Sequence, residues 1–151
     1  PALIVRQEGN NAHTHPFVSV YEAYKKSGPN VLGVEALQGD DGSTGVKVNT
    51  ADGYADYLFS ATDMQAHHPS KRVSFCGRLG LIREKEGQIQ LMYLGCGRSL
   101  KKGNFVLESD HDVYAAIYMQ HGVWYYSATG PVRVKIGKET KELNEGYNQK
   151  L

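Results

Sequence analysis

Hydrophobic and polar residues alternate with a period of two along most of the chain, and Gly, Pro, Asn and Asp interrupt the alternation. Successive side chains of a β-strand point to opposite faces, so this pattern predicts half-buried strands separated by turns. Many short strands at close spacing predict an all-β fold, an antiparallel β-sandwich of about ten short strands joined by hairpins. We expect these strands at Ala2–Glu8, Phe17–Tyr24, Val31–Leu37, Gly45–Thr50, Tyr54–Ser60, Val73–Arg83, Gln88–Gly97, Phe105–Glu108, Val113–Gln120, Val123–Ala128 and Val132–Ile136.

A chain of 151 residues is long enough for one domain with a substantial core. We expect residues 1–137 to form a single β-sandwich domain. The last stretch, KETKELNEGYNQKL at 138–151, is polar, and we expect it to be a C-terminal tail or an edge element of the sheet.

Turn residues predict the register of the first expected hairpin, GVKVNTADGYADYLFS. Asp52-Gly53 suits a two-residue type I′ turn, in which both residues have positive φ. That turn places Val48 opposite Tyr57 and Val46 opposite Phe59, which gives the hairpin one apolar face.

The longest expected hairpin, VSFCGRLGLIREKEGQIQLMYLGCGRS, contains Lys85-Glu86-Gly87, which fits a three-residue loop with glycine in the left-handed conformation. This register places Leu81 opposite Leu91 and, on the other face, Cys76 opposite Cys96. Two facing cysteines could form a disulfide, and the alternative is a pair of small buried thiols. A change of one residue in the loop would remove the apposition.

A third hairpin, DVYAAIYMQHGVWYYSATG, is expected to turn at His121-Gly122. Large side chains on both of its faces indicate a central hairpin with other groups packed on each side. Tyrosine can stack on a sugar ring and offer a hydroxyl, but only a tyrosine on the face away from the core would support that role. One face carries Ala115, Ile117, Met119, Trp124 and Tyr126, and the other carries Tyr114, Tyr118 and Tyr125.

Charge is nearly balanced, with 17 Lys and Arg against 16 Asp and Glu and a net charge of +1. An acidic polymer would therefore need a local basic patch, and nucleic acid is not an expected partner because no recognition motif occurs. No apolar run approaches the roughly 20 residues of a membrane span, so no membrane is expected as a partner either. Two small clusters, AHHPSKR and GRSLKKG, are either ordinary solvated loops or, if the fold brings them together, a basic patch of Lys71, Arg72, Arg98, Lys101 and Lys102.

Two histidines, His13 and His15, stand one residue apart in NNAHTHPF. If that stretch is extended, both imidazoles project from the same side, but a zinc site needs a third and usually a fourth ligand. The remote candidates match no zinc spacing, so we expect no metal and no cofactor in this chain; they are His67, His68, Asp110, His111, Asp112 and His121. The chain also has no G-x-S-x-G elbow, P-loop, Rossmann glycine run or H-E-x-x-H motif, which predicts that it has no self-contained active site.

Three segments within residues 1–100 carry a longer pattern. PALIVRQEGNNAHTHPFVSVYEAY contains an IVRQ strand followed by PFV-V-YE, and GVKVNTADGYADYLFS contains V-V…ADG-DY-FS. FCGRLGLIREKEGQIQLMYLGCGRSL contains GR-G-IR…G…LYL-G. In this order, the segments resemble the C-terminal β-sandwich region of heparinase II/III-like polysaccharide lyases.

The resemblance implies a piece of a lyase that lacks the α/α-toroid, which supplies much of the catalytic cleft. Such lyases cleave uronic-acid polymers such as heparan sulfate or alginate by β-elimination. The catalytic Tyr, His and Asn of the family, and its metal ligands, lie upstream of the matched segments, so the resemblance assigns no catalytic residue to this chain. The implied partners are the upstream toroid and an acidic polysaccharide, and the implied location is periplasmic or secreted.

We therefore hypothesise a non-catalytic domain that supports the catalytic toroid, can line its cleft, and is inactive alone. Asn11, His13 and His15 would contact substrate or the domain interface if their turn faces the toroid, although similar lyases tend to have Trp, Asn or Arg before the Pro-Phe. Lys71, Arg72 and Arg98 are further candidates for such contact. The alternatives are an independent carbohydrate-binding module and a structural or protein-contact domain, and the latter would leave an apolar face bare in isolation.

Overall fold

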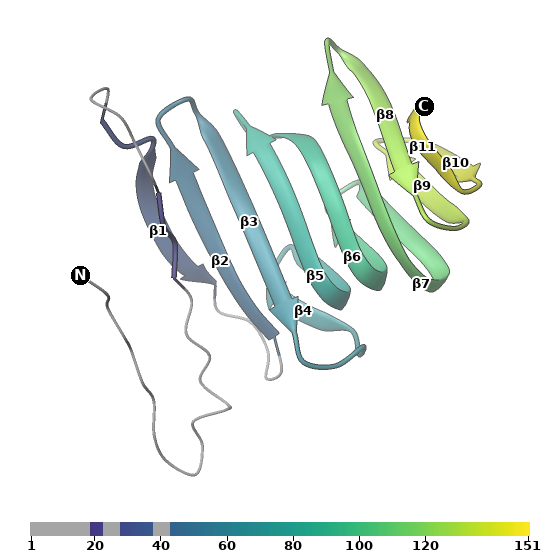
Figure 1. Cartoon of the computed structure of the whole chain (residues 1–151), viewed down its shortest axis with the longest axis horizontal. Helices are drawn as coiled ribbons and strands as arrows, with labels where there is room; N and C mark the ends of the chain where they lie inside the picture. The colour runs from purple at the N-terminus through teal and green to yellow at the C-terminus, as the bar shows by residue number, and fades with distance from the viewer. Residues whose placement is uncertain (1–18, 23–27, 38–42) are drawn as a thin grey trace.

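The structure, a computed structural model, describes residues 19–22, 28–37 and 43–151. Within these ranges the protein is all-β, with antiparallel strands and no helix, which confirms the predicted fold class (Figure 1). The eleven strands are β1 Val31–Leu37, β2 Ser43–Thr50, β3 Tyr54–Ala61, β4 His67–Ser70, β5 Val73–Lys85, β6 Gln88–Lys102, β7 Phe105–Gln120, β8 Val123–Ala128, β9 Val132–Ile136, β10 Glu139–Leu143 and β11 Gly146–Lys150.

Some expectations concern the N-terminal part of the chain. The strand expected at Ala2–Glu8 and the candidates Asn11, His13 and His15 lie outside the described residues. Of the strand expected at Phe17–Tyr24, only residues 19–22 are described, and they are not in a strand.

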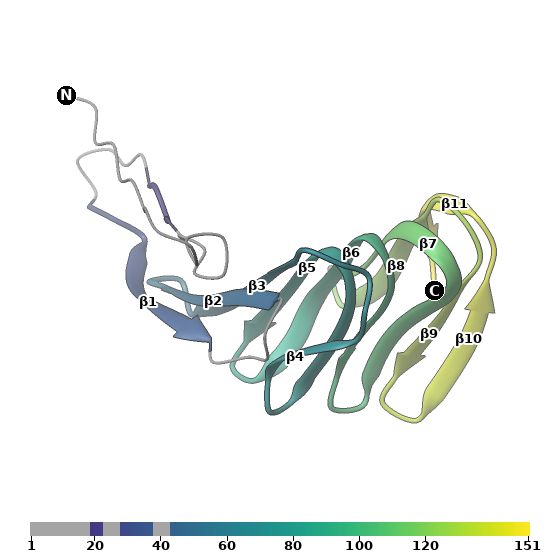
Figure 2. The same ribbon diagram turned by 90° about the horizontal axis from the view of Figure 1, so that it is seen from below.

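Both layers of the sandwich come from one continuous sheet, in which β1-β2-β3-β5-β6-β7-β8-β11 are neighbours in that order. β4 pairs with β5, β9 with β7 and β10 with β9 outside this path. The long strands take part in both layers, since β7 pairs with β8 over Ala115–Gln120 and with β9 over Phe105–Glu108. In Figure 2 these strands curl over, so that the second layer (β4, β9, β10 and the adjoining ends of β5, β6 and β7) packs on the first layer.

The hydrophobic core lies between the two layers. The first layer contributes Ile82, Met92, Leu94 and Ile117, all fully buried. Each such side chain stabilises the fold by roughly 1.5–3 kcal/mol relative to exposure. The second layer contributes Phe75, Leu100, Leu107 and Val134, which are also fully buried.

A pair of glycines marks the bend between the layers. Gly77 of β5 is the cross-strand partner of Gly97 of β6, with register shifts beside both. A Cβ on Gly97 would lie 2.6 Å from the carbonyl oxygen of Cys76 and 2.7 Å from the Cα of Gly77. Bulges bend and twist a strand, and here the two backbones approach so closely that no side chain fits between them.

The first hairpin differs from the prediction by one residue in register. Val46 pairs with Leu58 and Val48 with Asp56, because the loop has three residues rather than two. Only Gly53 has positive φ there, and its N–H donates to the carbonyl of Thr50 at 3.1 Å. Since a shift of one residue exchanges the faces, Phe59 points into the core and the two valines point away from it.

The second hairpin also differs from its predicted register. Glu86 and Gly87 form a two-residue turn with φ of 51° and 77°, and a bulge follows between Arg83 and Glu84. Together these bring Leu81 opposite Tyr93. The predicted cysteine pair is wrong, as Cys76 lies opposite Ser99, Cys96 occupies an irregular position with φ of 49°, and both thiols are free.

The third hairpin has the predicted register. His121 and Gly122 form the turn with φ of 51° and 77°, and Ile117 pairs with Tyr126. Tyr118 and Tyr125 pair on the opposite face, where their rings stack with centroids 6.0 Å apart.

Three strands were not among those expected. β4 is short, and β10 and β11 come from the polar stretch 138–151. Among the described strands, β10 pairs only with β9, and β11 lies at the end of the sheet beside β8, so this stretch forms edge strands. The expected domain boundary at residue 137 stays a prediction. β7 joins the strands expected at Phe105–Glu108 and Val113–Gln120, with the intervening residues bulged out of register.

We predict that Gly97→Ala lowers the free energy of unfolding by about 1–3 kcal/mol, because the new methyl group would meet backbone atoms that cannot move independently. The measurement is urea denaturation followed by tryptophan fluorescence. Gly33→Ala is the control, since a Cβ there would meet only the Asn49 side chain at 3.9 Å. We expect Gly33→Ala to change stability by less than about 0.5 kcal/mol; equal losses in the two variants would contradict the proposed role of the bend.

Candidate functional site

One face of the first layer points away from the core, and we call it the open face. Its exposed apolar side chains include Leu58, Leu79 and Tyr114, with 38%, 53% and 54% of their surfaces accessible. Strand alternation and cross-strand pairing place on this face Tyr54, Asp56, Leu58, Leu79, Leu81, Arg83, Tyr93, Tyr114, Ala116, Tyr118, Tyr125 and Ser127.

The half of the open face over β2, β3 and β5 is aliphatic. We call this the aliphatic patch, which consists of Val46, Val48, Leu58, Leu79 and Leu81. A hollow of about 550 Å³ lies on it, and Ser19, Val20 and Tyr21 line the same hollow. The two valines are buried, whereas the leucines of this patch remain partly accessible.

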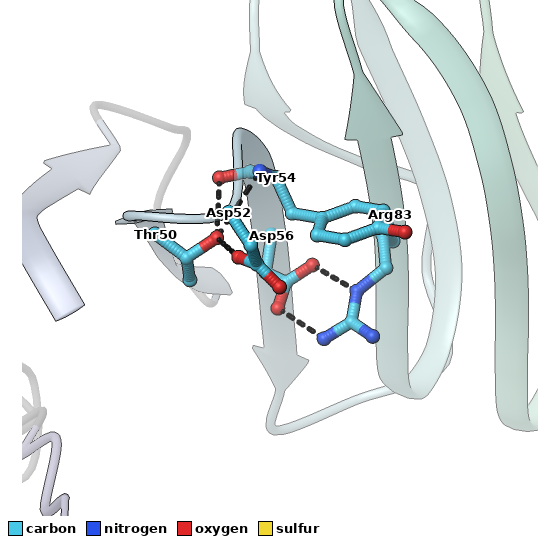
Figure 3. A network of polar contacts seen from close by, with 5 residues as sticks. All are labelled: Thr50, Asp52, Tyr54, Asp56 and Arg83. Atoms are coloured by element: carbon cyan, nitrogen blue, oxygen red, sulfur yellow. Dashed lines mark hydrogen bonds and ion pairs between the residues drawn. The ribbon is translucent and has the colours of Figure 1, made fainter. Parts of the chain in front are cut away.

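A polar network on β3 and β5 lies next to the aliphatic patch, since the pair Asp56 and Arg83 follows the pair Leu58 and Leu81 on the same face. Figure 3 shows this network. Arg83 Nε and Nη2 donate to the two carboxylate oxygens of Asp56, each at 2.7 Å. The guanidinium carbon lies 5.1 Å from the centre of the Tyr54 ring, and Lys85 Nζ lies 4.8 Å from it. Asp56 raises the pKa of Arg83. A bidentate pair of this kind holds Arg83 in place and neutralises the nearly buried Asp56 carboxylate. The positive charge of Arg83 is therefore already paired within the domain.

The other half of the open face, over β6, β7, β8 and β11, carries tyrosines around a groove of about 680 Å³. We call it the tyrosine groove; its side walls include Tyr93, Tyr114 and Tyr147, and its floor includes Ala116 and Ser127. Tyr147 is 84% exposed. Small floor residues between large exposed rings leave a trough in which a flat, partly apolar ligand fits.

The groove depends on close backbone packing at both ends. A Cβ on Gly95 would lie 3.0 Å from the Tyr93 hydroxyl, so this ring lies against a position without a side chain. A Cβ on Gly146 would lie 2.9 Å from the Tyr126 hydroxyl, so β11 lies directly against the buried Tyr126 side chain. β11 thereby brings Tyr147 to the edge of the groove.

The two basic clusters lie close together in the second layer, because Val73, which follows Arg72, pairs with Lys102. Most of their cations are paired within the domain. Lys102 Nζ contacts Glu84 at 2.9 Å and lies 3.5 Å above the Tyr57 ring, and burial lowers the pKa of its ammonium. Arg98 Nε donates to Asp112 at 2.8 Å. Lys71 and Arg72 are exposed in the turn between β4 and β5, and their contact with a polymer stays a prediction.

A row of alternating charges crosses the outer surface of the second layer. Lys101 contacts Glu108 at 2.6 Å, Glu108 contacts Arg133 at 3.1 Å, and Arg133 contacts Glu142 at 2.5 Å. Lys101, and then Arg133, hold the pKa of Glu108 below its ordinary value. The charges in this row compensate one another, so the row has little net positive charge with which to attract an acidic polymer.

The remaining candidate ligands do not come together. His67 is buried and its Nε2 lies 2.8 Å from Asp63 Oδ1, while His121 lies in the turn after β7. Asp110 and His111 are exposed in the bulged part of β7. Among the described residues, no group of three or more His, Cys, Asp or Glu side chains is placed to hold a metal ion.

The sequence did not reveal the groove as a site. Tyr114 was placed correctly on the face opposite Ile117, but Tyr147 was missed because it lies in a stretch of polar residues. The signal that could have found Tyr147 is a single aromatic residue after Gly146, because a short polar stretch can still form an edge strand of the sheet.

The fold and the open face define a β-sandwich domain with exposed apolar and aromatic side chains on one side of its sheet. Residues 31–119 match the family model of the endo-acting ulvan lyase C-terminal domain, and the chain belongs to this family. It is thus a polysaccharide-lyase C-terminal domain, as the sequence predicted, although the match specifies ulvan lyases and not heparinase II/III-like lyases.

A relative supports this membership. The chain is 34% identical over 114 residues to an endo-acting ulvan lyase of Formosa agariphila. The matched region is 72% of this chain but only 14% of the relative. No solved structure matches the chain. In the part of the chain that the structure describes, no helix has the length and apolar character needed to cross a membrane.

We predict that Glu108→Gln lowers the free energy of unfolding at pH 7 by about 0.5–1 kcal/mol, because the paired carboxylate is lost. The folded-state pKa of Glu108 is depressed, so its contribution is present above the ordinary value of 4.5 and is lost as the pH falls through the folded value. Urea denaturation at pH 7 and at pH 2 should therefore show a difference between variant and wild type only at pH 7. Glu139→Gln, at an exposed position of β10, is the control; an effect of Glu108→Gln that is equal at both pH values would show that the ion pairs do not cause it.

Proposed function

We propose that this chain is a non-catalytic domain of a lyase that cleaves a uronic-acid polysaccharide by β-elimination, and that it packs on the rest of the lyase through the aliphatic patch. The observation that carries the proposal is the exposure of Leu58 and Leu79 on the open face of a domain with an otherwise complete core. Contiguous exposed apolar surface of this kind marks an interaction site.

The position of the patch indicates what covers it. Ser19, Val20 and Tyr21 precede every described strand, and they line the hollow on the patch. The first described residues therefore lie beside the patch. The Formosa relative is about seven times longer than the matched region, which supports a large neighbouring catalytic region as the occupant.

The chemistry assigned to the parent lyase supports a non-catalytic role for this domain. β-Elimination needs a base for the proton next to the carboxylate, groups that neutralise that carboxylate, and an acid for the leaving oxygen. In the described residues, Arg83 near the open face is paired with Asp56, and Arg98 of the second basic cluster is paired with Asp112. We therefore place the catalytic groups, and any metal or cofactor, in the catalytic region.

The relative favours ulvan as the polymer over the heparan sulfate or alginate that the resemblance suggested. A toroidal catalytic region of the heparinase II/III kind remains part of the proposal. We also place the parent lyase outside the cytoplasm, periplasmic or secreted, where a polymeric substrate is accessible.

A second function is favoured by a separate observation. Tyr114 and Tyr147 lie exposed on the face away from the core, which is the arrangement that the carbohydrate-binding alternative requires. The domain can carry both functions, because the tyrosine groove and the aliphatic patch occupy different halves of the open face.

We predict that the isolated chain releases no unsaturated product from ulvan, whereas the full-length lyase that contains it does. The measurement is the ultraviolet absorbance of the unsaturated sugar formed by β-elimination. The reason is that the catalytic groups lie elsewhere in the lyase. Turnover by the isolated chain would show that the assignment of the chemistry is wrong.

We predict that Leu79→Glu weakens the attachment of this domain to the rest of the full-length lyase without unfolding the domain. A carboxylate in the interface would be buried without a partner, whereas at this exposed position in the isolated chain it costs less than about 0.5 kcal/mol. Limited proteolysis should release the domain faster from the variant lyase, and the isolated variant should unfold at the wild-type urea concentration. Thr140→Glu adds the same charge to exposed β10 and is the control; equal proteolysis of both variants and wild type would refute docking through the patch.

A further inference from the structure

We infer that the tyrosine groove is a binding site for a sugar ring of an acidic polysaccharide, which stacks against Tyr114 and Tyr147. The nature of the polymer rests on the proposed function, while the existence of the site rests on the groove itself. Neither ring belongs to the core, and both line one groove although they come from β7 and β11.

The floor of the groove is built to let a ligand approach the sheet. Tyr93, Ala116 and Ser127 form one cross-strand row across β6, β7 and β8. The large member of the row stands at one side, and the two small members leave space above the backbone. A large residue at position 116 or 127 would fill this space. The hollow is therefore due to the small side chains of Ala116 and Ser127, and not to a missing part of the core.

Neighbouring tyrosines show that exposure is a property of these two rings and not of all tyrosines in the domain. Tyr126 packs into the core. Tyr118 stacks on Tyr125, and its hydroxyl donates to Asn148 Oδ1 at 2.5 Å. Within the described residues, the hydroxyls of Tyr114 and Tyr147 make no hydrogen bond, so both phenols are available to sugar hydroxyl groups.

The other polar groups of the groove indicate how a charged sugar would lie. The hydroxyls of Ser127 and Thr129 accept backbone N–H groups, from Asn148 at 2.9 Å and Tyr114 at 3.0 Å, so they hold the groove together. Glu145 lines one side and would accept hydrogen bonds from sugar hydroxyls while repelling anionic groups. Lys150 does not line the groove, but it pairs with Tyr125 and therefore projects to the same open face, where it can attract a sulfate or carboxylate.

The test is the binding of ulvan oligosaccharides to the complete 151-residue chain by isothermal titration calorimetry. We expect Tyr114→Ala and Tyr147→Ala each to weaken binding about tenfold, as for an aromatic anchor of an interface. Tyr114→Phe and Tyr147→Phe should stay within about threefold of wild type because they keep the stacking ring. Lys150→Gln should weaken binding in low salt more than in high salt.

Tyr21→Ala is the matched control, since Tyr21 is 85% exposed and lines the hollow of the aliphatic patch. It should bind as wild type does, and urea denaturation should show that all variants fold. No binding by the wild-type chain, or equal binding by wild type and both alanine variants, would overturn the site.

The same substitutions in the full-length lyase separate this inference from the proposed function. We expect Tyr114→Ala and Tyr147→Ala to weaken its retention on an ulvan affinity gel while turnover of short oligosaccharides is unchanged. If retention does not change in the full-length lyase, the groove is covered by the lyase itself and the inference is wrong. Turnover by the isolated chain would refute the proposed function and leave the groove unaffected.

Discussion

The close contact of Gly77 with Gly97 is the constraint on which the rest of the structure depends. It allows β5 and β6 to bend together, so one hairpin supplies strands to both layers. Gly80 serves the same purpose further along, because a Cβ there would lie 3.1 Å from Phe75 and 3.2 Å from Phe59. The absence of side chains on one side of the bend thus makes room for the largest rings of the core, and the domain gains a second layer without a second sheet.

A sheet folded over in this way buries one face of its first layer and leaves the other available. The exposed face then divides by side-chain type, with leucines and valines over β2, β3 and β5 and tyrosines over β6, β7, β8 and β11. Tyr93 lines both hollows and stands at the boundary. Aliphatic side chains suit the packing of another protein surface, whereas exposed phenol rings suit sugars, so the proposed functions follow from the division.

Alternation of polar and apolar residues predicted many of the strands well, and Val31–Leu37, Val123–Ala128 and Val132–Ile136 have the expected bounds. It did not predict the register of the first two hairpins, because their register depends on loop length and bulges. The backbone N–H of Tyr54 donates to the Thr50 hydroxyl and stabilises a longer loop than the Asp-Gly pair suggested. β10 was missed for another reason: its residues are mostly exposed, so backbone pairing with β9 leaves no hydrophobic pattern in the sequence.

The near neutrality of the chain limits how this domain could recognise an acidic polymer. With a net charge of +1, its overall field attracts polyanions weakly. Its local fields are also reduced, because Arg83, Arg98, Lys101 and Lys102 all have carboxylate partners within 3 Å. Recognition must then depend mainly on contacts that do not need charge. The exposed rings of the tyrosine groove provide such contacts, and Lys150 on the same face needs only to orient a sugar that is already held by stacking.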